Sequence, residues 1–149
     1  IYGDKISGTE EPLIEENVNH FILSGKLTYS RSCWSGLSLG KSIVKDGGCF
    51  IGYNLPFSFW VDNRWSASPM HDETAKLFLS PSNELAKELI RGKSGYEAAK
   101  KFEDLSKKTI LKLLNEESSE PGTIQKIKIL WNNIVGQEVL GDGDMKYKD

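Results

Sequence analysis

The segment LTYSRSCWSGLSLGKSIVKDGGCFIGYN, residues 27–54, decides the fold. Its beginning, residues 27–32, is typical of a strand, and residues 49–54 are short and almost wholly apolar, as in a strand buried inside a sheet. Between them, apolar residues recur at helical spacing until a pair of glycines at 47–48 ends the pattern. A helix between two such strands predicts a βαβ unit, and therefore an α/β fold.

The flanking segments add helices. Apolar residues at helical spacing predict an amphipathic helix from Glu11 to Leu23. From Asp72 onward helical patterns dominate, over residues 84–91, 96–115 and 123–135. The acidic, serine-rich residues 115–122 are predicted to be a surface linker. The aromatic-rich residues 55–69 are predicted to be an edge strand or a long loop, and residues 138–148 a strand, a turn and a strand. We therefore predict a mostly parallel sheet flanked by helices, with a helix-rich C-terminal half.

Composition excludes several classes of function. The 149 residues suit one domain, residues 1–149, and 38% hydrophobic with 27% charged residues is ordinary for a folded protein. A net charge of −2 and a pI near 5.8 disfavour nucleic acid as a partner. Neither a membrane-spanning run nor a signal peptide is evident, and two cysteines make no disulfide framework. These features predict a cytoplasmic protein with free thiols, without membrane or nucleic-acid partners.

Residues 32–42, SCWSGLSLGKS, allow two interpretations. The first is a phosphate-binding loop that ends in Gly40-Lys41-Ser42. Such a loop needs glycine at the position that Ser35 occupies, and Gly36 lies one residue too late. Nucleotide binding is therefore the weaker interpretation.

The second interpretation begins from Cys33. In parallel α/β sheets, reactive groups gather at the carboxyl ends of strands, and Cys33 follows the first strand of the βαβ unit. The positive end of the following helix would favour the thiolate, and Ser32, Ser35 and Gly36 are small enough to admit a substrate backbone. The competing explanation is an inert buried thiol, which is the commonest fate of a cysteine.

The order of three short motifs resembles the caspase–gingipain group of cysteine peptidases, including CHAT-domain and separase-like members. The motifs are YSRSCWSG, SLGKSIVKDGGCFIGY and the terminal VLGDGDMKY. The resemblance covers residues 1–65 well and the C-terminal tail loosely. It implies a caspase-like peptidase fold and a thiol protease activity, with a protein or peptide as substrate and no metal or cofactor.

The resemblance also implies roles for individual residues. Cys33 would attack the peptide carbonyl, its backbone N–H would form half of an oxyanion hole, and Gly36 would keep the turn tight. The family takes its base from a His-Gly dipeptide upstream of the cysteine, which this chain lacks. Neither His20 nor His71 matches that position. Because the chain starts at Ile1 in what resembles mid-domain sequence, we expect a portion that is incomplete at its N-terminus.

The resemblance also indicates which residues line the substrate pocket, but it leaves the selected substrate residue open. In the family it is lined by residues around the cysteine strand and by the loop after the next strand, which here points to Ser32, Trp60, Asp62 and Asn63. A pocket that contains Asp62 would select a basic residue before the scissile bond, whereas one dominated by aromatic rings would select an apolar residue. Core packing under a long loop explains the aromatic cluster equally well.

The sequence therefore predicts a cysteine endopeptidase domain that uses Cys33, with a histidine supplied from upstream or from a companion domain or chain. The alternative is a peptidase-like module that has lost catalysis and serves as a binding or scaffold unit. The absence of His-Gly favours this alternative if the chain is complete.

Overall fold

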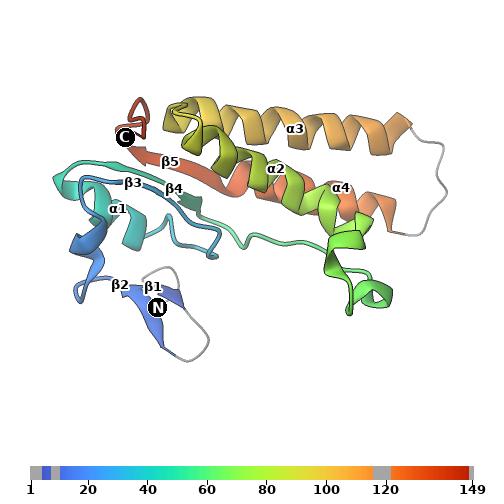
Figure 1. Cartoon of the computed structure of the whole chain (residues 1–149), viewed down its shortest axis with the longest axis horizontal. Coiled ribbons are helices and arrows are strands. Elements are labelled where there is room, and N and C mark those ends of the chain that lie inside the picture. Colours follow the sequence, from blue (N-terminus) through green and yellow to red (C-terminus); the bar gives the residue numbers. More distant parts are fainter. Residues whose placement is uncertain (1–4, 8–10, 116–121, 148–149) are drawn as a thin grey trace.

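The computed structural model describes residues 5–7, 11–115 and 122–147, and its center is a three-stranded sheet (Figure 1). The strands are β3 (Leu27–Tyr29), β4 (Cys49–Tyr53) and β5 (Gln137–Gly141), in the order β3-β4-β5. β3 runs parallel to β4, with Leu27 opposite Cys49. The crossover between them contains α1 (Leu39–Ile43) and a 3-10 turn, η2 (Val44–Asp46). The predicted βαβ unit and the α/β fold are confirmed.

The expectation of a mostly parallel sheet is wrong for the described strands, because β5 runs antiparallel to β4. The preceding helix, α4 (Thr123–Gly136), ends beside the carboxyl end of β4, where Gln137 pairs with Tyr53. From that end, β5 can pair with β4 only by running back along it. The sheet is therefore mixed.

The N-terminal helix predicted at Glu11–Leu23 is also absent. The chain instead forms a two-stranded hairpin, β1 (Lys5–Ser7) and β2 (Pro12–Glu15), and a 3-10 turn, η1 (His20–Leu23). Asn17 has a φ of 61°, outside the right-handed helical region. The Asn19 side chain accepts from the Glu15 N–H and donates to the Leu13 carbonyl, so local side-chain bonds replace those of a helix.

The C-terminal helices are α2 (Glu73–Ile90), α3 (Gly95–Asn115) and α4, which lie side by side (Figure 1). α3 and α4 match the predicted ranges within one residue. α2 begins at Glu73 instead of residue 84, because Asp72 accepts a hydrogen bond from the Ala75 N–H and caps it there. The aromatic segment is a loop with two 3-10 turns, η3 (Asn63–Trp65) and η4 (Pro69–His71).

Two further predictions concern the linker between α3 and α4 and the segment after α4. Of the predicted linker 115–122, residues 116–121 lie outside the described residues. The predicted C-terminal strand–turn–strand is confirmed for β5 alone, since the segment after it forms a single bridge between Lys146 and Ser94. No helix within 5–7, 11–115 and 122–147 is long and apolar enough to cross a bilayer.

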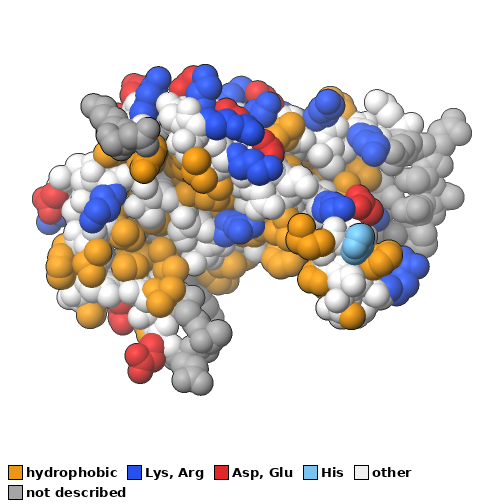
Figure 2. Space-filling view, in the orientation of Figure 1, with side chains coloured by type: hydrophobic (Ala, Val, Ile, Leu, Met, Phe, Trp, Pro, Cys, Tyr) orange, Lys and Arg blue, Asp and Glu red, His pale blue; other side chains and the backbone are white. Residues whose placement is uncertain are grey.

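The sheet is covered on both faces. One face packs against α2 and α3 through buried residues that include Ile51, Tyr53, Leu85 and Phe102. The other face packs Phe50 against Leu39 and Ile43 of α1. A third cluster, Phe78, Leu113 and Leu130, joins the three long helices. On the outer side of these helices, Lys and Arg alternate with Asp and Glu, as the upper edge of Figure 2 shows.

Candidate active site

Cys33 lies in the turn that follows β3, at the carboxyl edge of the sheet. Two backbone bonds tie the ends of this turn to β4. The Ser30 N–H donates to the Ile51 carbonyl at 2.9 Å, and the Gly36 N–H donates to the Tyr53 carbonyl at 3.0 Å. A Cβ on Gly36 would lie 3.3 Å from the Tyr53 carbonyl carbon, so a side chain here would crowd the strand. Gly36 therefore lets the turn lie close to β4.

The backbone after Cys33 is strained. Trp34 has a φ of 57°, in the left-handed region that costs a bulky residue on the order of 1–3 kcal/mol. The Leu37 N–H donates to the Trp34 carbonyl at 3.0 Å, and the Gly40 N–H to the Ser35 carbonyl at 2.8 Å. Packing and these bonds must offset the strain, so the turn has a defined shape.

The two cysteines have different surroundings, and both are free thiols, as predicted. Cys33 is half-buried, and its Sγ lies 3.9 Å from the carbonyl oxygen of Phe57, at the beginning of the long loop. Cys49 is fully buried in β4. Burial, and secondarily the charge of Asp142, raise the pKa of Cys49 to about 11. Cys33 is therefore the cysteine that a substrate can reach.

The helix expected to begin beside the Cys33 sulfur is short and begins several residues after Cys33. α1 begins at Leu39, six positions after Cys33 by sequence number, and extends only to Ile43. A helix dipole acts mainly within the first turn of a helix. The expected contribution of a helix N-terminus to Cys33 is therefore minor, and any stabilisation of a thiolate must come from other groups.

The structure disfavours the phosphate-loop interpretation. The backbone N–H groups of residues 35, 36, 37 and 40 already donate to carbonyl oxygens of the turn or of β4. The Ser42 hydroxyl, which would bind Mg²⁺ in such a loop, donates instead to the Glu16 carboxylate at 2.5 Å. Gly40 and Lys41 lie within α1. A loop whose amides are already paired cannot enclose phosphates.

The histidines lie in other parts of the fold. His20, in η1, accepts a hydrogen bond from the Asn17 N–H through Nδ1. His71, in η4, has its ring centroid 5.7 Å from that of Trp65. η4 lies beyond the long loop that leaves β4, on the side of the molecule away from α1 (Figure 1). Among the contacts of the described residues, none joins either histidine to Cys33.

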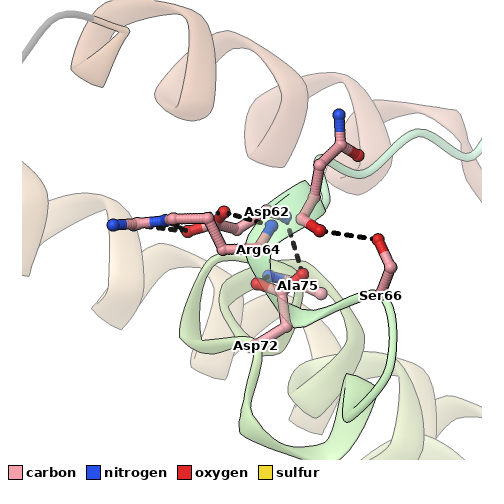
Figure 3. Close-up of polar contacts among 6 residues, drawn as sticks. Asp62, Arg64, Ser66, Asp72 and Ala75 are labelled. Atoms are coloured by element: carbon pink, nitrogen blue, oxygen red, sulfur yellow. Dashed lines mark hydrogen bonds and ion pairs between the residues drawn. The ribbon is translucent and has the colours of Figure 1, made fainter.

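The predicted pocket residues of the long loop are held elsewhere. Asp62 forms an ion pair with Arg64 at 2.6 Å, and its own N–H donates to Asp72 at 2.7 Å (Figure 3). The Asn63 carbonyl accepts from Ser66 in the same local network. The Arg64 interaction lowers the pKa of Asp62. The contacts of Asp62 and Asn63 are thus with the segment before α2, whereas the loop contacts Cys33 at Phe57.

Trp60 and Ser32 have distinct positions. A Cβ on Gly122, before α4, would lie 2.9 Å from the Trp60 ring, which places Trp60 against the start of that helix. Ser32 lies in the cysteine turn, where its N–H donates to the Ser30 hydroxyl at 3.2 Å. Of the predicted pocket residues, Ser32 is therefore the one that the chain itself places next to Cys33.

Sequence reasoning missed Glu138 of β5, which lies opposite Gly52 at the same edge of the sheet. Its Oε2 lies 3.1 Å from the position that a Cβ on Gly36 would take, and its Oε1 accepts a hydrogen bond from Asn54 Nδ2. The residue is part-buried. A carboxylate therefore lies against the cysteine turn, and only the β4–β5 register could have revealed this.

Comparison of the chain with protein-family models, with curated proteins and with solved structures finds no match in any of the three. The function must therefore be inferred from the site itself.

Proposed function

We propose that this chain forms the nucleophile-bearing part of a cytoplasmic, caspase-like cysteine endopeptidase, with Cys33 as the nucleophile. The observation that carries the proposal is the position of Cys33, half-buried in a constrained turn at the carboxyl end of a strand that has a parallel neighbour. Reactive groups in α/β folds gather at this edge. Two free thiols also suit a reducing compartment.

In the proposed reaction, the Cys33 thiolate attacks the carbonyl carbon of a peptide bond and forms a tetrahedral adduct. The C–N bond then breaks, the amine leaves with a proton from a histidine, and a thioester remains on the sulfur. Water hydrolyses the thioester, which releases the carboxylic acid and restores the thiol. The Cys33 N–H is the proposed donor to the oxyanion. The reaction needs no reactant other than the peptide and water.

The histidine would come from a strand that pairs with the open edge of β3. Cys49 N–H donates to the Lys26 carbonyl, and Ser30 N–H donates to the Ile51 carbonyl. Because backbone groups alternate in direction along a parallel strand, those of Leu27 and Tyr29 face away from β4. No strand of the described residues pairs with that side. A strand added there would end beside the Cys33 turn.

The test is cleavage of a peptide library by the intact protein, read by mass spectrometry. We expect Cys33→Ala to abolish cleavage and Cys49→Ala, the matched control in the buried strand, to retain it. His20→Ala and His71→Ala should also retain cleavage, since neither histidine contacts the cysteine turn. Cleavage that survives Cys33→Ala would refute the proposal.

A binding or scaffold module is the second candidate, favoured by the absence of a contact between Cys33 and a histidine among the described residues. It predicts that the intact protein cleaves no peptide in the library. It also predicts that Cys33→Ala leaves the binding of any captured peptide unchanged.

A further inference from the structure

A cavity of about 650 Å³ lies at the amino end of β3, at the opposite end of the sheet from the Cys33 turn. Two segments line it: residues 25–27 at the start of β3, and residues 142 and 144–147 after β5. The proposed reaction uses neither segment. The cavity is therefore a separate feature that needs its own explanation.

The wall after β5 is held in place by backbone hydrogen bonds. The Asp142 N–H donates to the Gly48 carbonyl at 2.9 Å, and the Tyr96 N–H donates to the Gly143 carbonyl at 2.9 Å. These bonds attach the segment to the sheet and to the start of α3, beside which Figure 1 shows it. The backbone of this wall is therefore fixed before any ligand binds.

The other wall is the unpaired edge of β3. The Lys26 carbonyl and the Ser30 N–H bond to β4, so the backbone groups of Leu27 face the opposite side. Within the part of the chain that the structure describes, no strand pairs with that side. Such an edge can bind an extended peptide as an additional strand, through the backbone of both. The occupant that this wall fits is therefore an extended segment.

Two carboxylates of the cavity favour a cation. Asp142 and Asp144 belong to one turn, in which Asp142 Oδ1 accepts from the Asp144 N–H at 3.1 Å. Among the described residues, neither carboxylate forms an ion pair with Lys or Arg. A strand that covers the cavity would remove water from both, and a cation on that strand would offset the loss.

The cavity also contains two lysines, and both are engaged with other groups. Lys26 Nζ donates to the Ile22 carbonyl, on its own side of the cavity. Lys146 Nζ lies 3.8 Å from Glu97 of α3. Their contacts therefore leave the two aspartates available to a positively charged ligand.

We propose that this cavity binds an Arg or Lys side chain near the amino end of a strand that adds to the open edge of β3. The inference rests on the proposed function, in which that strand carries the histidine, and it adds a second requirement for the strand. The alkyl stem can pack on Leu27 and Met145 while the charged end reaches the aspartates. Leu27 precedes Cys33 by six positions, and strand residues rise about 3.3 Å each, so the basic residue should precede the histidine by roughly four to six positions.

The experiment measures the binding of fluorescein-labelled strand peptides to the 149-residue chain by fluorescence anisotropy. The peptides end in His-Gly and differ only in one residue near the amino end: Arg, Lys, norleucine or Glu. Two further Arg peptides are N-methylated at alternate amides, one set for each edge of the strand. The protein is tested as the wild type and as the double variant Asp142→Asn with Asp144→Asn. Asp104→Asn, at an exposed carboxylate on α3, is the control for a lost surface charge.

We expect the Arg and Lys peptides to bind at least about threefold more tightly than the norleucine peptide, as for a surface ion pair, and the Glu peptide to bind most weakly. The double variant should lose this preference and keep its affinity for norleucine, whereas Asp104→Asn should resemble the wild type. High salt should reduce the preference, because salt screens exposed charges. One of the two N-methylated peptides should lose binding, because it cannot donate to β3.

Equal affinity for the four peptides, or a preference that survives in the double variant, would overturn the inference. Unchanged binding of both N-methylated peptides would also overturn it, because the basic side chain would then bind without strand pairing. Each mixture is also tested for cleavage of the peptide library, which separates this inference from the proposed function. Cleavage with equal affinity for the Arg and norleucine peptides would refute the cation site alone, and a charge preference without cleavage would refute the peptidase alone.

Discussion

Cys33 and Cys49 are identical side chains at opposite ends of the crossover between β3 and β4, and their surroundings differ. Cys33 lies half-buried in a strained turn, beside the carbonyl oxygen of Phe57, and the Glu138 carboxylate lies against Gly36 in the same turn. Cys49 lies inside β4 with no solvent exposure, and burial raises the pKa of its thiol to about 11. The comparison teaches that position in the sheet decides accessibility: the thiol in the turn after β3 can be reached from solvent, whereas the thiol inside β4 cannot.

The largest effect on stability should come from the contact that packs α1 against β4 and β5. A Cβ on Gly40 would lie 2.7 Å from Phe50 and 2.9 Å from Leu140. Gly40→Ala should therefore reduce the free energy of unfolding by about 3 kcal/mol, the upper range for overpacking. Urea unfolding measures the change.

The same variant tests whether the alkylation rates of the two cysteines change independently of each other. The Gly40 N–H also supports the turn through Ser35, so alkylation of Cys33 should change in Gly40→Ala, while Cys49, on the other face of β4, stays protected in the folded protein. Lys41→Ala, at an exposed position in the same helix, is the control. Equal stability of the two variants would contradict this packing.

The second prediction concerns pH. The folded-state pKa of Cys49 is raised from 9.0 to about 11, so the folded protein holds this proton more tightly than the unfolded chain does. The stabilisation is present in full below pH 9 and is lost as the pH rises from 9 toward 11. At pH 10.5 the loss should be about 2 kcal/mol relative to pH 7.

The measurement is the free energy of unfolding at both pH values in the wild type, Cys49→Ala and Cys33→Ala. Since other groups titrate in this range, the informative quantity is the difference between variants. Cys49→Ala should show the smaller decline, and Cys33→Ala should match the wild type. An equal decline in all three proteins would show that Cys49 does not carry the effect.

The smallest effect should come from Asp62→Asn. This substitution removes an exposed ion pair with Arg64, and such pairs contribute little to stability. The Asp62 N–H still donates to Asp72, so the loop keeps its anchor. We expect an unchanged alkylation rate at Cys33 and a nearly unchanged melting temperature. A large change in the Cys33 rate would place Asp62 closer to the turn than its contacts indicate.

The differences between the sequence predictions and the structure have local and tertiary causes. The helix expected at residues 11–23 has the right apolar spacing, but Asn17 and Asn19 favour a turn through their own conformations and side-chain bonds. The pocket at Asp62 and Asn63 is expected from the family resemblance, in which the loop after the second strand lines it, whereas the contacts of both residues in the structure are with the segment before α2. A loop that leaves a strand can instead extend along a helix, as the bonds between Ser58 and Asn133 of α4 show.

The sequence by itself determined the βαβ unit, the ranges of α3 and α4, and the choice of Cys33 over Cys49 as the candidate nucleophile. These follow from periodicity, glycines and position after a strand, all of which are local properties. Only the tertiary structure decided the antiparallel direction of β5, the bond of the Asp62 N–H to Asp72, and the approach of Glu138 to Gly36. The reason is physical: residues far apart in the chain meet through strand register and helix packing, which local patterns do not encode.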